Sequence, residues 1–543
     1  MLKPISEERE KELEKILSGM SLEEKAGQVL CPWIEKMSSD DLVAMLEKYH
    51  MGNVYNGAES AERFLEVKKV FDDFAKDHPI PIMQCSDLEL GAGARIQQNA
   101  TSLPWPMAWG ALDSEEVCYE CGVATAKEGR MHGHHWNLAP VVDLSMNHMN
   151  PMCYARPFGE KPDRVAALTR AFIRGMQEHG MAATAKHFPG DGVDAREPHV
   201  ATSVHSLSLD EWYKTYGYVY QQVIEEGVLT IMTAHMAFPA IDSDTNRNIG
   251  YWPTTLSKKI TTDFLKGELG FEGVVVTDAI RMIGFSAHYP INERVARAVA
   301  AGADIILGGR DEDYPWLMEC IERGIVDEDR LTDACRRILN VKERVGLFDG
   351  SMEQTVTDED KKKFRKLPVQ IAENCMSIVR NDGTIPVKLE KGDKVLCVDV
   401  QFLGTLREFV QSLPVVREEL EKRGFKVDYK TTPFHGDKIR EIMHDYKAVF
   451  VNFNVPPRYG STRMVSELVE SFWRAWWTEH PQVVFTSFCN PYTIWELPNL
   501  SNYINVFSNL PENQRAAVQL WLGECEAKGK SPVSLEGIFD CEV

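Results

Sequence analysis

The sequence contains no long uninterrupted apolar segment, although 44% of its 543 residues are hydrophobic. No window approaches the length of about 18 apolar residues at which a segment becomes a candidate membrane helix. Residues 1–20 are acidic and amphipathic and lack the apolar core of a secretory signal. These absences predict a chain that does not span a bilayer and is located in the cytoplasm.

Positive charge is also scarce. The chain has 60 lysines and arginines against 81 aspartates and glutamates, which gives a formal net charge of -21. Such an excess of negative charge argues against nucleic acids and anionic membranes as partners, and it carries no information about the fold.

The sequence also lacks the patterns of metal and nucleotide sites. Its twelve cysteines are scattered among apolar runs and form no disulfide framework. Cys118 and Cys121 make a C-x-x-C, but it lies in a helical stretch, and no second Cys or His pair stands at zinc-finger spacing. No G-x-G-x-x-G or Walker A motif follows a predicted strand. We therefore predict neither a metal nor a cofactor.

What the chain does have, between residues 27 and 309, is a regular alternation of short apolar runs with helical stretches. This alternation predicts a (β/α)8 TIM-type barrel, with a doubly wound sheet as the alternative. The number of runs and the polar residues that end them favour the barrel. The runs are GQVLCPW (27–33), GNVYNG (52–57), PIMQCSD (81–87), HHWNLAP (134–140), MAATAKH (181–187), VLTIMTAH (228–235), GVVVTD (273–278) and ADIILGG (303–309).

The domain plan follows from composition. Residues 1–348 form the predicted catalytic barrel, and the charged stretch 349–366 is the predicted linker. Residues 367–543 alternate again and predict a smaller three-layer α/β sandwich domain. Its expected strands are KVLCVDV (394–400), FKVDYK (425–430), AVFVNFN (448–454), VVFTSFC (483–489) and NYINVFS (502–508).

Ionisable residues end several of the barrel runs. In a barrel, the carboxyl ends of the strands face one shared mouth, so residues at these positions are candidates for chemistry. Asp278 closes the run FEGVVVTD, which suits a rigidly held nucleophile, although an Asp there could also cap the next helix. The other candidates are Asp87, Lys186, His187 and His235 at strand ends and His199, Arg95 and Arg156 in the loops beyond.

Several of these stretches resemble glycoside hydrolase family 3, and specifically its β-N-acetylglucosaminidase branch. The likeness covers most of residues 20–350 and, more weakly, the second domain. The matching stretches are SLEEKAGQ (21–28), SDLELGAGAR (86–95), NLAPVVDLS to RPFGEKP (137–162), AKHFPGDG to EPH (185–199), TAHMAFPAID (233–242), LSKKITTDFLKGELGFEGVVVTDAIRM (256–282), AGADIILG (301–308) and RILNVKERVGLF (337–348).

The resemblance implies roles for individual residues. It makes Asp278 the nucleophile and His199 the general acid/base, with Glu197 as the partner of His199. The usual D-S-H of this branch is Glu197-Pro198-His199 here, and Asp191 stands where the branch usually has His. Both departures put the sugar preference in doubt more than the reaction type. The implied substrate-binding residues are Asp87, Arg95, Arg156, Lys186, His187, His235 and Met282.

The resemblance thus implies a retaining, exo-acting β-glycosidase, with β-N-acetylglucosaminidase the first expectation and a small carbohydrate as the substrate. A β-glucosidase, a phosphorylase of the same family and a non-catalytic sugar-binding relative stay open. A metal-dependent barrel hydrolase is a further alternative, because His and carboxylate at strand ends also build metal sites. The H-x-H pair that often begins such sites is missing. The sequence does not predict the oligomeric state.

Overall fold

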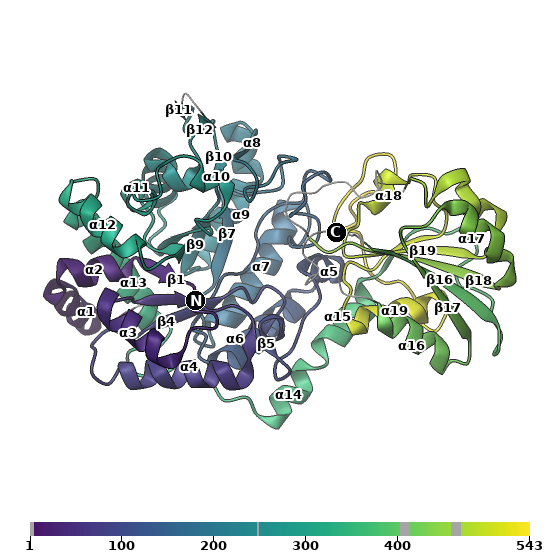
Figure 1. The fold of residues 1–543 in the computed structure, drawn as a ribbon, viewed down its shortest axis with the longest axis horizontal. Helices are drawn as coiled ribbons and strands as arrows, with labels where there is room; N and C mark the ends of the chain where they lie inside the picture. Colours follow the sequence, from purple (N-terminus) through teal and green to yellow (C-terminus); the bar gives the residue numbers. More distant parts are fainter. Residues whose placement is uncertain (1–4, 247–248, 402–412, 458–468) are drawn as a thin grey trace. The chain divides into compact units, whose positions relative to one another are not determined.

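The structure is a computed structural model that describes residues 5–246, 249–401, 413–457 and 469–543. The chain folds as two compact units, each built from more than one segment (Figure 1). The first unit comprises the described residues up to Ser102, Glu115–Leu144 and Ala166–Phe364. The second comprises Leu103–Ser114, Ser145–Val165 and Arg365–Val543.

Each of the eight apolar runs of the first unit contains a strand, and these strands pair in parallel. Their residues are buried throughout, as expected of parallel strands covered by helices on the outside. The strands are β1 (Leu30–Pro32), β2 (Asn53–Tyr55), β4 (Met83–Ser86), β6 (Trp136–Asn137), β7 (Thr184–Phe188), β9 (Thr230–Thr233), β13 (Val274–Thr277) and β14 (Ile306–Gly309).

The ladders between these strands form three small sheets, with orders β1-β14, β2-β4-β6 and β13-β9-β7. Single bridges join the sheets. They link Trp33 to Tyr55, Trp136 to Ala182, and Val276 to Ile305. The predicted alternation of parallel strands and helices is confirmed, whereas closure into one continuous barrel sheet stays a prediction.

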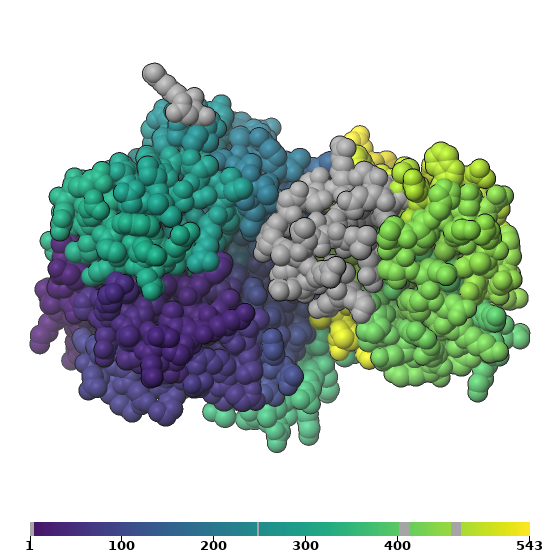
Figure 2. Space-filling model, viewed as in Figure 1, coloured from purple at the N-terminus to yellow at the C-terminus, as the bar shows by residue number. Residues whose placement is uncertain are grey.

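Helices surround these strands, and helices from the beginning and the end of the unit's sequence pack against each other. A capping box opens α2 (Leu22–Gln28): Ser21 Oγ accepts from Glu24 N, and Glu24 Oε2 accepts from Ser21 N. Helix α2 packs against α12 (Asp313–Glu322) and α13 (Glu328–Arg344), and the purple and teal-green surfaces of these parts adjoin in Figure 2.

The other helices of this unit separate successive strands. None of the helices in the described ranges is both long and apolar enough to cross a membrane. The helices are α1 (Glu7–Gly19), α3 (Ser39–Tyr49), α4 (Ala61–Phe74), α6 (Glu115–Met131), α7 (Pro162–Gln177), α8 (Leu209–Lys214), α9 (Tyr216–Glu225), the π-helix η3 (Lys259–Glu268), α10 (Ile283–Ser286), α11 (Arg294–Ala301) and α14 (Asp358–Phe364).

The second unit is built on one sheet in the order β15-β20-β19-β18-β16-β17. All five predicted strands are present. The sixth, β15, is an antiparallel edge strand whose short, partly exposed sequence SIVR carries little pattern. The strands are β15 (Ser377–Arg380), β16 (Lys394–Gln401), β17 (Lys426–Thr431), β18 (Ala448–Asn454), β19 (Val483–Phe488) and β20 (Tyr503–Asn505).

Helices lie on both faces of this sheet. Figure 1 shows α16 (Pro414–Lys422) and α19 (Pro511–Trp521) along one face and α17 (Gly436–Ile442) on the other. Helix α15 (Leu367–Cys375) packs against α19. The second unit is therefore a three-layer α/β arrangement. Helix α14 of the first unit falls within the segment 349–366, whose role as a linker stays a prediction.

One lysine of α13 is buried away from the strand ends. The Lys342 side chain is fully buried, and its Nζ donates to Gln28 Oε1 and to Gly52 O, both at 2.9 Å. Within the described ranges no carboxylate forms an ion pair with it. Burial lowers the pKa of Lys342 to about 7, because a charge is costly in an environment that replaces water with two neutral acceptors.

We expect Lys342 to make stability pH-dependent. The unfolded lysine titrates near ~10.4, so between about pH 7 and that value the unfolded chain binds more protons and stability rises with pH. Lys342→Met does not titrate. The free energy of unfolding of wild type minus that of the variant should therefore grow by about 2 kcal/mol from pH 7.5 to pH 9. Urea titrations of both proteins at the two pH values measure this, and an unchanged difference would contradict it.

Candidate active site

The carboxyl end of β13 carries Asp278, which the strand holds firmly. Its backbone N donates to Thr233 O at 3.1 Å, and one carboxylate oxygen accepts from Ala279 N at 2.6 Å. Burial raises the pKa of Asp278, but the neighbouring His187, His235 and His199 and the N–H of Ala279 outweigh that effect, and the net pKa lies below the usual value. The site therefore keeps this carboxylate ionised, as a nucleophile requires.

A network of charged groups surrounds Asp87, which follows β4. Lys186 Nζ lies 3.0 Å from Asp87 Oδ1 and 2.7 Å from Glu89 Oε1. The Tyr55 hydroxyl donates to Asp87 Oδ2 at 2.9 Å, and Arg95 Nη2 lies 3.5 Å from the same oxygen. The structure thus brings the predicted Asp87, Lys186 and Arg95 together. Glu89 and Tyr55 join this network without having been predicted.

His187 is oriented by a carboxylate that sequence reasoning also missed. Asp143 is fully buried, and its Oδ2 lies 2.7 Å from His187 Nδ1. Its Oδ1 accepts from His187 N at 3.0 Å and from Asp191 N at 2.7 Å. The bond to Nδ1 directs Nε2 of His187 away from Asp143. Because Asp143 ends the apolar run APVVD, just as Asp278 ends VVVTD, this parallel is the signal that could have found it.

The predicted dyad residues are in contact. Glu197 Oε2 lies 2.5 Å from His199 Nδ1 and also accepts from His199 N at 2.7 Å. Glu197 is buried, whereas 29% of the His199 side chain is exposed. The imidazole therefore binds Glu197 through Nδ1, and this contact orients the ring.

His235 follows β9, and both of its ring nitrogens have partners in the protein, so a role in substrate binding stays a prediction. The side chain is fully buried, its Nε2 donates to Ala279 O at 3.1 Å, and its Nδ1 lies 2.9 Å from Thr255 Oγ1. Burial lowers the pKa of His235 to about 4, so the ring is neutral near pH 7. His235 thus shapes the turn that carries Asp278.

The last two predicted residues are Met282 and Arg156. Met282 is buried, and its backbone N donates to Ala279 O at 3.1 Å. Arg156 is half-buried and lies on the segment Ser145–Val165, which folds with the second unit. A role in substrate binding stays a prediction for both.

Aromatic and cationic groups beyond β1 and β13 form a further part of the mouth that sequence reasoning missed. The rings of Trp33 and Tyr55 lie 5.6 Å apart, and the Arg281 guanidinium lies 4.3 Å from the centre of the Trp33 ring. Tyr55 also binds Asp87. These three side chains therefore connect the charged network around Asp87 with Arg281, which lies on the segment that follows Asp278.

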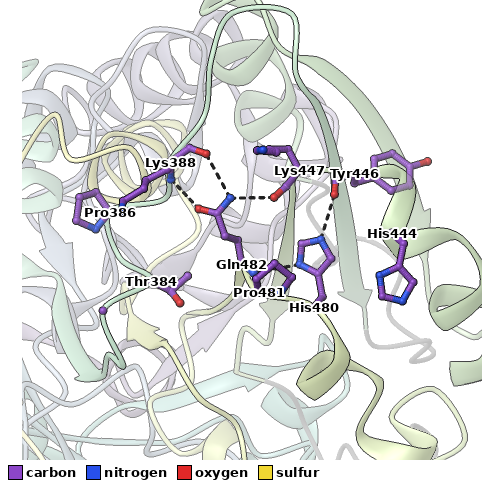
Figure 3. Close-up of a pocket in the computed structure, with 10 residues that line it drawn as sticks. Thr384, Pro386, Lys388, His444, Tyr446, Lys447, His480, Pro481 and Gln482 are labelled. Carbon is purple, nitrogen blue, oxygen red and sulfur yellow. Dashed lines mark hydrogen bonds between the residues drawn. The ribbon is translucent and has the colours of Figure 1, made fainter.

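A cavity of about 600 Å³ lies elsewhere, in the second unit, near the amino ends of β18 and β19 (Figure 3). Gln482 donates to the carbonyl oxygens of Lys388 and Lys447, and His480 Nε2 donates to Tyr446 O. These polar groups are hydrogen-bonded to one another, and none of the residues described around Asp278 lines the cavity. We therefore place the chemistry at the strand ends of the first unit.

Comparisons with known proteins support this choice. The family model described as the glycosyl hydrolase family 3 N terminal domain matches residues 21–341. A Cellulomonas fimi protein named β-N-acetylglucosaminidase/β-glucosidase is 28% identical over 549 residues, covering 95% of this chain and 94% of that protein. Two solved structures are also similar over nearly the whole chain.

One of these structures is described as a β-glucoside phosphorylase bound to 2FGlc. It has a TM-score of 0.87 and 28% identity and covers 98% of this chain and 97% of its own. The other is a family 3 β-N-acetylglucosaminidase from Paenibacillus sp. str. FPU-7, with a TM-score of 0.84 and 26% identity, covering 97% and 100%.

We expect Asp143→Asn to lower kcat/KM by roughly 10- to 100-fold, the loss found when a carboxylate that orients a metal-binding histidine is removed from other enzymes. Asp143 accepts three N–H groups, and the amide of Asn would direct its own N–H₂ at one of these donors. Steady-state kinetics on a nitrophenyl glycoside, corrected for the folded fraction, measure the loss.

Asp242→Asn is the matched control, because Asp242 is a buried carboxylate that binds Ser257 Oγ and Lys259 Nζ instead of an active-site histidine. It should leave kcat/KM within about threefold of wild type, since it keeps every contact of the histidines. Equal losses in the two variants would show that Asp143 acts only through general stability.

Proposed function

The chain belongs to glycosyl hydrolase family 3, and we propose that it is a retaining, exo-acting β-glycosidase that removes β-linked N-acetylglucosamine. The observation that carries the proposal is the grouping of an ionised Asp278 with the Glu197–His199 pair in one unit. A retaining glycosidase needs these two functions: a nucleophile at the anomeric carbon and a proton donor at the leaving oxygen.

In the first step an Asp278 carboxylate oxygen attacks the anomeric carbon, and a bond from that carbon to the leaving oxygen breaks. The proton on His199 Nε2 passes to the leaving oxygen. Glu197 stabilises the imidazolium before this transfer, because a carboxylate beside an imidazole favours its charged form. The enzyme then holds the sugar as an ester of Asp278.

In the second step water attacks the same carbon and returns the electron pair of the ester bond to Asp278. His199, now neutral, takes a proton from that water and is ready to donate again. We assign the binding of sugar hydroxyls to Asp87, Arg95 and Lys186, whose charged network faces the same mouth.

We also propose the finer architecture that the sequence implies: a closed (β/α)8 barrel in residues 1–348 and an α/β sandwich in residues 367–543, joined by 349–366. The ladders and the three single bridges support closure, since together they link the eight strands in a ring. The expected cytoplasmic location belongs to the same proposal.

Phosphorolysis is the second candidate. The likeness to the β-glucoside phosphorylase structure extends over 98% of this chain. A histidine acid/base also repels an incoming phosphate less than a carboxylate would, which leaves phosphate free to take the place of water in the second step. The Cellulomonas fimi relative is named for two sugar specificities, so a β-glucosidase activity is part of the same test.

The first test is turnover of matched 4-nitrophenyl glycosides. We expect kcat/KM to be at least about tenfold higher for the β-N-acetylglucosaminide than for the β-glucoside, a difference of roughly 1.4 kcal/mol in transition-state binding.

Asp278→Ala should lower kcat by more than about 1,000-fold while the protein stays folded, because it removes the covalent step. A clear preference for the glucoside would refute the sugar assignment, and an active Asp278→Ala would refute the nucleophile.

The second test separates hydrolysis from phosphorolysis by product. With the β-N-acetylglucosaminide and 10 or more times its concentration of inorganic phosphate, a hydrolase releases the free sugar, because water remains the acceptor. Mass spectrometry of the products distinguishes the free sugar from a glycosyl phosphate. If the glycosyl phosphate is the main product, the enzyme is a phosphorylase and the hydrolytic assignment is wrong.

A further inference from the structure

The loop that carries His199 is hydrogen-bonded to the segment that follows the nucleophile. Ile283 N donates to His199 O at 3.2 Å, and Gly284 N donates to Pro198 O at 3.0 Å. Both N–H groups lie at the start of α10, where a helix has no partners of its own to offer them. Two carbonyl groups of the His199 loop therefore accept hydrogen bonds from the first N–H groups of α10.

Thr202 makes a second connection from the same loop. Its Oγ1 donates to Gly284 O at 3.0 Å and lies 2.9 Å from His288 Nε2. A hydroxyl has one hydrogen, and a carbonyl oxygen can only accept, so His288 Nε2–H must donate to Thr202 Oγ1. Burial lowers the pKa of His288, in agreement with a neutral ring.

Gly284 is the point of closest approach between the two segments. A Cβ at this position would lie 2.8 Å from His235 O and 2.9 Å from the carbonyl oxygens of Ala201 and Pro198. Distances this short are not tolerated between a Cβ and backbone atoms. Two of these three carbonyl groups flank His199 in sequence, so any side chain at Gly284 would displace the loop that carries it.

We propose that Thr202, Gly284 and His288 form a latch that sets the position of the His199 imidazole relative to Asp278. The inference rests on the proposed function, since it assigns positioning residues to the acid/base of that reaction. Asp278 and His288 belong to one short, continuous segment. This segment carries the nucleophile at its start, and further on it is hydrogen-bonded to the loop that carries His199.

The chemistry gives the latch a measurable signature. A retaining enzyme holds its nucleophile and its acid/base at a fixed separation across the scissile bond, and a displacement of about 1 Å can cost roughly 100-fold in rate. A shifted imidazole harms the transfer of a proton to the leaving oxygen but leaves the attack of Asp278 in place. A latch variant should therefore fail with leaving groups that need a proton and work with those that do not.

The experiment measures kcat/KM for a phenyl and a 2,4-dinitrophenyl β-N-acetylglucosaminide. Thr202→Val removes both hydroxyl contacts and should lower the phenyl value by roughly tenfold, with less than about a twofold change for the dinitrophenyl substrate. Thr202→Ser keeps the hydroxyl and should restore the phenyl value. Thr262→Val is the matched control, because Thr262 is also half-buried and donates to a carbonyl oxygen, that of Ala301.

A second pair of variants tests the close approach. Gly284→Ala should lower the phenyl value by more than Thr202→Val does, because its Cβ meets three carbonyl oxygens. Gly267→Ala is its control, since Gly267 is exposed and its Cβ would meet only Thr262 O, at 3.5 Å. The Thr202 pair decides the question if Gly284→Ala does not fold.

The outcomes separate the latch from the function on which it rests. A selective loss with the phenyl substrate, reversed by Thr202→Ser, supports the latch. Equal losses with both substrates, or no rescue by Ser, overturn it while leaving the glycosidase assignment intact. A wild type that cleaves neither substrate overturns the proposed function itself, and the latch with it.

Discussion

The ionised state of Asp278 is the constraint on which this site depends. A half-buried carboxylate tends to take up a proton, because burial disfavours the charged form. Three histidines reverse that tendency here, and each reaches Asp278 from a different part of the first unit: His187 from β7, His235 from the end of β9, and His199 from the loop beyond β7. The unit thus groups three imidazole side chains around one strand end.

The three histidines differ in their hydrogen-bond partners. His187 and His199 each bind a buried carboxylate through Nδ1, whereas His235 binds the neutral groups Ala279 O and Thr255 Oγ1. A carboxylate partner therefore fixes the ring orientation of His187 and of His199, whereas His235 lies in a neutral, buried environment that favours the uncharged ring.

The sequence could predict the elements and most of the residues that approach one another. Apolar runs identified all eight strands of the first unit, and their polar ends pointed to Asp87, Lys186, His187 and Asp278. It could not predict Glu89 and Tyr55, because their contribution depends on which strand ends become neighbours. Asp143 was missed although it ends an apolar run, because its contact with His187 also depends on the neighbouring strand. The contact of His235 with Thr255 could not be predicted for the same reason, since Thr255 lies twenty residues further along the chain.

Glu197-Pro198-His199 stands where the related branch has D-S-H, and both its side chains and its backbone make contacts that hold His199. The additional methylene of Glu lets one carboxylate oxygen bind both Nδ1 and the backbone N of His199, at 2.5 and 2.7 Å. Pro198 has no N–H that could compete for this oxygen, and its carbonyl accepts from Gly284 N instead. Side chain and backbone therefore hold His199 from two directions, and Glu at this position keeps a carboxylate on the imidazole.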